Sequence, residues 1–171
     1  MTVVEEVRMR REAEFDALVR EGQDRWLRLA HMITRDWHVA RDAVQDALIG
    51  VHRGWARLPE GAARDAYLRR SVVNASLRQL RRRPKTLPLA DESALPPAPG
   101  GDPADRVAAA DEAWRLCAEL GPVQRAAVVL RFHDDLTYAD IAEVLGCPEA
   151  TARSHVHRAL GTLRQALEER S

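Results

Sequence analysis

The sequence is poor in cysteine, aromatic residues and lysine. Its two cysteines, Cys117 and Cys147, are too few for a disulfide framework and lack the CxxC spacing of a zinc site, so we expect buried structural thiols. Aromatic residues make up 5% of the chain and β-branched runs are short, which disfavours strands. Lysine occurs once, at Lys85, so arginine carries nearly all of the positive charge.

The sequence also lacks a long apolar run and an excess of either charge. No window approaches about 18 consecutive apolar residues, the length of a membrane span. The first residues, MTVVEEVRMRREAEF, contain no apolar core of a secretion signal. We therefore expect a cytoplasmic protein with no membrane contact of its own. The 26 basic and 26 acidic residues cancel, and a net charge of zero argues against a protein that coats nucleic acid.

The residues that dominate the composition favour helices. They are alanine, leucine, arginine and glutamate, which all have high helix propensity. Residues 84–103 contain six of the nine prolines and two adjacent glycines, a composition typical of a linker. We predict an all-α fold in which two small helical domains, at residues 12–83 and 107–171, are joined by a flexible proline-rich linker at residues 84–106.

Apolar residues at helical spacing predict the individual helices. In the first domain, Phe15 to Ile33 share one face of a helix, and Pro59 and Gly61 separate the two helices that follow. Those two helices are expected at about residues 40–55 and 64–82. In the second domain we predict four helices, at about residues 105–119, 122–133, 138–145 and 149–168.

Two of these helices, within residues 135–164, have the pattern of a helix-turn-helix. Thr137 and Asp140 form a variant of the capping box at the start of the first helix. Gly146 suits a left-handed helix end, and Pro148 suits the first turn of the next helix. The short turn between two amphipathic helices therefore predicts a compact pair.

The second helix of the pair has an apolar face and a polar face. The apolar face is predicted to contain Ala152, Val156, Ala159, Leu160 and Leu163. The polar face contains Arg153, Ser154, His157 and Arg158. In a DNA major groove, arginine can bond guanine while serine and other arginines contact phosphates. The alternative is an ordinary solvated helix face. His155 and His157 point in different directions, which argues against a metal site.

Residues 120–164, LGPVQRAAVVLRFHDDLTYADIAEVLGCPEATARSHVHRALGTLR, resemble region 4 of the extracytoplasmic-function (ECF) sigma factors, a group of the sigma-70 family. Similar helix pairs also occur in unrelated activators of the response-regulator type. The resemblance implies that the second helix recognises the minus-thirty-five promoter element. The residues implied in this contact are Thr151, Arg153, Ser154, His157 and Arg158.

Residues 38–58, HVARDAVQDALIGVHRGWARL, resemble region 2.2 of the same family. That region docks on a coiled coil of the β′ subunit of RNA polymerase. The residues implied in docking are Asp42, Gln45, Asp46 and Ile49, which lie on one stripe of a helix. Without the resemblance, a solvated face beside the buried alanines and valines is the simpler interpretation.

Residues 65–84, DAYLRRSVVNASLRQLRRRP, resemble regions 2.3 and 2.4, which melt the promoter and read its minus-ten element. Melted DNA requires a basic track for the backbone and stacking surfaces or pockets for unpaired bases. Seven arginines and one aspartate lie between residues 64 and 83. The residues implied in this contact are Arg57, Tyr67, Arg70, Asn74, Arg78, Arg81 and Arg82. The alternative is a charged helix without a ligand.

Together these stretches identify the chain as a member of the ECF sigma factors. The resemblance implies a subunit that binds core RNA polymerase, recognises both promoter elements and aids promoter melting. It implies no enzymatic activity, catalytic residue, metal or cofactor of its own. Its partners are the polymerase core and promoter DNA, and the family adds the expectation of an anti-sigma factor. The alternatives are a dimeric helix-turn-helix regulator that acts alone and, more remotely, an enzyme.

Overall fold

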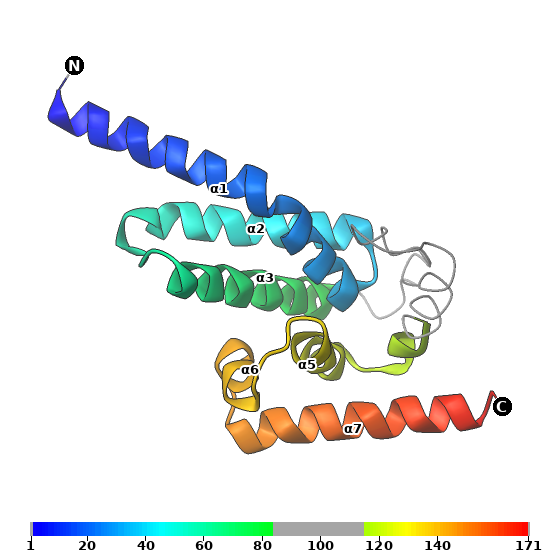
Figure 1. Cartoon of the computed structure of the whole chain (residues 1–171). Coiled ribbons are helices and arrows are strands. Elements are labelled where there is room, and N and C mark those ends of the chain that lie inside the picture. The colour runs from blue at the N-terminus through cyan, green and yellow to red at the C-terminus, as the bar shows by residue number, and fades with distance from the viewer. Residues whose placement is uncertain (1, 84–114, 171) are drawn as a thin grey trace, which may run out of the picture.

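Two groups of helices build the structure, a computed structural model that describes residues 2–83 and 115–170 (Figure 1). The first group contains α1 (Val3–Thr34), α2 (Trp37–Gly54), the 3-10 helix η1 (Trp55–Arg57) and α3 (Ala62–Arg82). The second group contains the 3-10 helix η2 (Cys117–Glu119), α5 (Pro122–Phe132), α6 (Tyr138–Leu145) and α7 (Glu149–Glu168). The described residues contain no strand, and the prediction of an all-α fold is confirmed.

Some predicted elements lie outside the described residues. The linker at residues 84–106 is one of them, and most of the predicted helix at 105–119 is another. The described end of that helix differs from the prediction, because Cys117–Glu119 forms a 3-10 helix.

The helix α1 begins earlier than the apolar pattern predicts. Thr2 and Glu5 form a capping box, in which the Thr2 hydroxyl accepts a hydrogen bond from the Glu5 amide and the Glu5 carboxylate accepts one from the Thr2 amide. The pairs Arg8–Glu12 and Arg10–Glu14, each at 3.1 Å, support the next turns. This part of α1 projects past the ends of α2 and α3 (Figure 1). The capping box and the ion pairs thus stabilise the start of α1, which has no apolar core packed against it.

A layer of large apolar side chains holds α1, α2 and α3 together. It includes Trp26 and Ile33 of α1, Val51 of α2, and Leu68 and Val72 of α3. The Trp26 ring lies directly against the backbone at Gly22, where a Cβ atom would come within 2.4 Å of the ring. Glycine is therefore required on this face of α1.

Asp36 fixes the turn between α1 and α2. Its carboxylate accepts hydrogen bonds from the amides of His38 and Val39, at 2.9 and 3.1 Å, and so caps α2. The Nη1 atom of Arg83, just beyond α3, lies 2.7 Å from the same carboxylate. Burial opposes ionisation of Asp36, but the hydrogen bonds from Arg83, Val39 and His38 outweigh this effect and lower its pKa. One buried carboxylate therefore ties the end of α3 to the start of α2.

The helix pair α6–α7 forms as its sequence predicts, with one exception. Thr137 and Asp140 make the capping box, and Gly146 ends α6 in the left-handed region with φ 65°. The predicted apolar face of α7 is buried at Ala152, Val156 and Ala159. Leu160 is 38% exposed, so its assignment to the buried face is wrong. Only a narrow stripe of α7 packs on α5 and α6. Leu160 lies outside this stripe, because it points about 100° away from Ala159 around the helix axis.

The two groups of helices pack against each other. The helix α5 contacts α1 and α3, and α6 contacts α3. Figure 1 shows α5 and α6 between α3 and α7. Ala126, Leu130 and Ile141 are fully buried and belong to one apolar cluster that also includes residues of α1, α2 and α3. The sequence pattern predicts both groups but not this contact between them.

We predict that Asp36→Ala lowers the free energy of unfolding by about 1–2 kcal/mol, because α2 loses its N-cap. Asp36→Asn should cost less, since the amide still caps the helix but cannot pair with Arg83. Urea unfolding at neutral pH measures both. The advantage of aspartate over asparagine requires the ionised carboxylate, so it should disappear as the pH falls below the ordinary value of 3.8. Equal stability of all three proteins at neutral pH would contradict this role.

Candidate nucleic-acid and partner interfaces

The predicted DNA-reading face of α7 is a continuous exposed surface. Its five residues, all exposed, are Thr151, Arg153, Ser154, His157 and Arg158. The opposite side of the helix carries the buried stripe and packs on α5 and α6. The Ser154 hydroxyl donates a hydrogen bond to the carbonyl of Ala150 at 2.9 Å, which orients the side chain along the helix. The structure thus brings the predicted residues together on one face of a rigidly packed helix.

Tyr138 of α6 holds one of these residues in place. The guanidinium of Arg153 lies 4.6 Å from the centre of the Tyr138 ring, and its Nη2 atom lies 3.1 Å from Oε1 of Glu149. Arg131 of α5 approaches the same ring at 5.4 Å. A cation over an aromatic face is attracted electrostatically. Arg153 is therefore positioned from two sides before any ligand arrives. This role of Tyr138 is not evident from the sequence pattern, because Tyr138 and Arg153 lie on different helices.

The exposed face of α3 is basic along most of its length. The predicted residues on this helix are Tyr67, Arg70, Asn74, Arg78, Arg81 and Arg82. All are exposed except Asn74, which is half-buried, and Tyr67 is 44% exposed. They recur three and four positions apart and so share one side of the helix. Arg57, also exposed, precedes this face in η1. The structure groups these residues as the sequence predicts.

Three other arginines of the predicted basic track are engaged within the protein. Arg64 donates a hydrogen bond to the carbonyl of Pro59 at 2.9 Å and lies 4.2 Å from the centre of the Trp55 ring. Arg83 pairs with Asp36, and Arg69 pairs with Asp134 of the second helix group at 2.8 Å. Arg64 therefore anchors the turn at residues 57–61, and these three half-buried arginines differ from the exposed arginines of α3.

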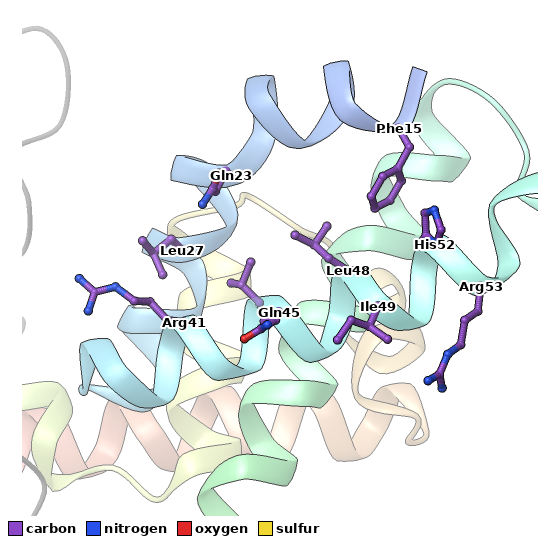
Figure 2. Close-up of a pocket in the computed structure, with 10 residues that line it drawn as sticks. Phe15, Gln23, Leu27, Arg41, Gln45, Leu48, Ile49, His52 and Arg53 are labelled. Carbon is purple, nitrogen blue, oxygen red and sulfur yellow. The ribbon is translucent and has the colours of Figure 1, made fainter. Parts of the chain in front are cut away.

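A groove lies between α1 and α2, with a volume of about 560 Å³. Figure 2 shows Phe15, Gln23 and Leu27 of α1 facing side chains of α2 across it. The residues that line it are Phe15, Gln23, Leu27, Arg41, Val44, Gln45, Leu48, Ile49, His52 and Arg53. Its floor is apolar and its rim is polar and basic. This shape suits the insertion of side chains from a partner helix.

The predicted docking residues have different positions around this groove. Gln45 and Ile49 line it, and Ile49 is 45% exposed. Asp42 is exposed one turn before Gln45. Asp46 is half-buried and accepts a hydrogen bond from the Nε2 atom of Gln79 at 2.8 Å. Asp46 thus also joins α2 to α3. The α1 wall of the groove is not evident from the sequence, because its residues are distant in the chain from those of α2.

The described residues give no sign of a metal centre or a membrane span. No group of three or more His, Cys, Asp or Glu side chains in residues 2–83 and 115–170 is arranged to hold a metal ion. No helix in that part of the chain is both long enough and apolar enough to cross a bilayer. Cys117 and Cys147 are half-buried rather than fully buried. Burial raises the pKa of the Cys117 thiol, which lowers its reactivity.

Known families and proteins match the chain along most of its length. The family models for Sigma-70 region 2 and Sigma-70 region 4 match residues 18–86 and 110–163. The RNA polymerase sigma-E factor of Streptomyces avermitilis is 34% identical over 157 residues, an alignment that covers 92% of this chain and 87% of that protein. The ECF RNA polymerase sigma factor SigM of Mycobacterium tuberculosis is 37% identical over 155 residues, covering 90% of this chain and 76% of that protein.

A solved structure has the same fold. It is the sigma factor RpoE in complex with the anti-sigma factor NepR from Bartonella quintana. The TM-score is 0.70 at 23% sequence identity, and the match covers 91% of this chain and 97% of that chain. At this identity the likeness concerns the arrangement of the helices.

We predict that Tyr138→Ala increases the motion of the Arg153 side chain without unfolding α6. Loss of the ring removes one of the two groups that orient the guanidinium, whereas Tyr138→Phe keeps it. The heteronuclear relaxation of the arginine Nε–H signals measures the effect on the nanosecond timescale. Arg70, exposed on α3, serves as an internal reference that should not change. An Arg153 signal that is equally ordered in the alanine and phenylalanine variants would contradict the positioning role.

Proposed function

The chain belongs to the sigma-70 family of RNA polymerase sigma factors, in the extracytoplasmic-function group, and from this premise we propose which of its surfaces perform each step of promoter recognition. As a sigma factor it binds core RNA polymerase and directs transcription initiation at promoters. One observation supports this assignment of surfaces. The helices α3 and α7 each bury apolar side chains on one side and present basic and polar side chains on the opposite side.

The α7 surface recognises the minus-thirty-five element. A helix that follows a short turn and packs on its neighbour through small residues can enter the major groove of duplex DNA. Arg153, already oriented by Tyr138 and Glu149, reads a base edge, since arginine bonds guanine bidentately. Thr151, Ser154, His157 and Arg158 complete the contact with bases and phosphates. Tyr138 acts through Arg153 and is a positioning residue.

The α3 surface, together with the turn at residues 57–61, binds the melted minus-ten element. Arg70, Arg78, Arg81 and Arg82 follow the phosphate backbone, and Tyr67 offers a ring on which a base can stack. Asn74 has both a donor and an acceptor for a base edge. The turn that Arg64 anchors would hold a base extruded from the strand, with Arg57 beside it.

The α1–α2 groove receives the coiled coil of the polymerase β′ subunit. Ile49 provides apolar contact, Gln45 provides hydrogen bonds, and Asp42 provides charge attraction to basic residues of the partner. Asp46 supports this surface by joining α2 to α3 through Gln79. Catalysis of RNA synthesis belongs to the polymerase. The protein itself is a non-enzymatic subunit of the cytoplasm, and an anti-sigma factor is a further expected partner.

We predict that Arg153→Ala combined with Arg158→Ala lowers promoter-directed transcription by about 100-fold, because each lost arginine contact costs about 1–3 kcal/mol. Binding to the polymerase core should be unchanged. Run-off transcription with purified core enzyme on genomic fragments measures activity and also finds the promoter. Arg11→Ala combined with Arg20→Ala is the control, since both residues are exposed on α1 and the loss of charge is equal. Joint loss of transcription and core binding would instead indicate a structural role for α7.

We predict that Asp42→Arg weakens binding to the polymerase core by at least about tenfold, since it reverses the charge beside the groove. A competition assay with a labelled sigma factor on purified core enzyme measures the affinity. Glu168→Arg is the matched control, because it makes the same change on an exposed residue at the far end of α7. Equal affinity of the two variants would contradict the proposed contact of Asp42 with the polymerase.

A further inference from the structure

Glu149 and Arg153 form an ion pair on the exposed side of α7. The Nη2 atom of Arg153 lies 3.1 Å from Oε1 of Glu149, and each side chain is 53% exposed. Residues four positions apart in a helix lie one above the other on the same face. Exposed pairs of this kind contribute little to stability. The pair is therefore more important for what it presents to a ligand than for the stability of α7.

The pair lies at the N-terminal end of α7, the part of a recognition helix that reaches base edges in a major groove. Glu149 is the first residue of the helix, directly after the N-cap Pro148. The Tyr138 ring, on α6, lies 4.6 Å from the guanidinium of Arg153 and restricts its motion. The pair is thus formed before DNA arrives, which reduces the entropy that is lost on binding.

The two side chains carry complementary hydrogen-bonding groups. A guanidinium has only donors, whereas an ionised carboxylate has only acceptors. Arg153 can present two N–H donors to a ligand while its Nη2 atom remains bonded to Oε1 of Glu149. The second carboxylate oxygen of Glu149 can accept a further hydrogen bond. Side by side, the pair therefore offers the order donor, donor, acceptor.

One base-pair edge in the major groove complements this order. A G·C pair presents the acceptors N7 and O6 of guanine, followed by the N4 amino donor of cytosine. The reversed C·G pair places the donor first, and in A·T and T·A pairs the donor lies between two acceptors. The two side chains together can therefore distinguish both the identity and the orientation of a base pair.

We propose that Glu149 is a specificity-determining residue, which accepts a hydrogen bond from cytosine N4 while Arg153 donates to the guanine of the same base pair. This inference rests on the proposed role of α7 in minus-thirty-five recognition. It adds to that role one G·C base pair, with its guanine facing Arg153. The carboxylate also repels phosphates, so Glu149 improves discrimination between sequences while it lowers the affinity for unrelated DNA.

A binding selection locates the base pair. The promoter found by run-off transcription is randomised across its minus-thirty-five element, and the duplexes bound by holoenzyme, assembled from core polymerase and the full chain, are sequenced. Wild-type protein should enrich a G·C pair at one position, and Arg153→Ala should lose that enrichment. Glu149→Ala should reduce it by about fivefold at the same position only. Glu168→Ala is the matched control, because it removes the same charge at the far, exposed end of α7.

Two results of the selection would overturn the proposal. One is the absence of any G·C pair whose enrichment depends on Arg153. The other is equal enrichment by the Glu149→Ala and Glu168→Ala proteins.

Removal of one amino group from the DNA separates a contact with cytosine from mere orientation of Arg153. The cytosine of the selected pair is replaced by 2-pyrimidinone, which lacks the N4 amino group, and the guanine is unchanged. Wild-type holoenzyme should bind this duplex about fivefold more weakly than the natural one, whereas Glu149→Ala should bind both about equally. Fluorescence anisotropy of labelled duplex measures the affinities. The weaker pairing within the modified duplex is common to all proteins and cancels in the comparison.

Two further variants complete this test. Glu149→Gln keeps an acceptor oxygen and should regain part of the wild-type ratio between the two duplexes. Tyr138→Ala acts only on the orientation of Arg153, so it should weaken binding to both duplexes and leave the ratio near fivefold. If Glu149→Ala also leaves the ratio near fivefold, Glu149 does no more than orient Arg153 and the proposal is wrong.

The failure of this inference differs from failure of the proposed function. If Glu149→Ala distinguishes the two duplexes as the wild type does, while Arg153→Ala combined with Arg158→Ala abolishes transcription, Glu149 contacts no base and α7 still recognises the promoter. If the loss of Arg153 and Arg158 has no effect on transcription, the assignment of α7 is itself wrong, and the role of Glu149 fails with it.

Discussion

The burial of α3 is the constraint on which the rest of the structure depends. This helix packs against α1 and α2 on one side and against α5 and α6 on another, while its remaining face carries arginines that must stay in water. Leu68, Val72 and Val73 are fully buried, and they hold the charged face at a fixed angle to both groups of helices. Arginine itself favours a helix, but tertiary packing of the buried face supplies most of the favourable free energy that stabilises α3.

Local patterns in the sequence were sufficient to predict most of the helices. Thr137, Asp140 and Gly146 are read correctly because a cap or a left-handed residue acts within one turn of its own position. The exposed face of α7 follows equally from helical periodicity. Leu160 is misassigned because periodicity gives the direction of a side chain but not the width of the surface that covers it. The start of α1 is missed because its capping box and ion pairs replace an apolar stripe.

The interactions that the sequence did not predict connect residues far apart in the chain. Arg125 reaches Ile33, Arg69 reaches Asp134, and Gln79 reaches Asp46. The neighbouring residues in a charged segment do not reveal whether an arginine faces DNA, an aromatic ring or a carboxylate. Only the three-dimensional arrangement separates Arg64 and Arg69, which bind within the protein, from Arg70 and Arg78, which are exposed. The sequence therefore predicted a candidate site rich in arginine, and the structure shows which of these arginines are exposed.

The pairing of Arg83 with Asp36 also determines where the chain leaves the first group of helices. Because this bond fixes residue 83 beside the start of α2, the chain that leads to the second group departs from one defined point rather than from a fraying helix end. The effective concentration of a tethered domain depends on the distance between its anchor and its binding site. A fixed anchor makes that distance a property of the fold, and here a buried carboxylate of the first group, that of Asp36, fixes the anchor.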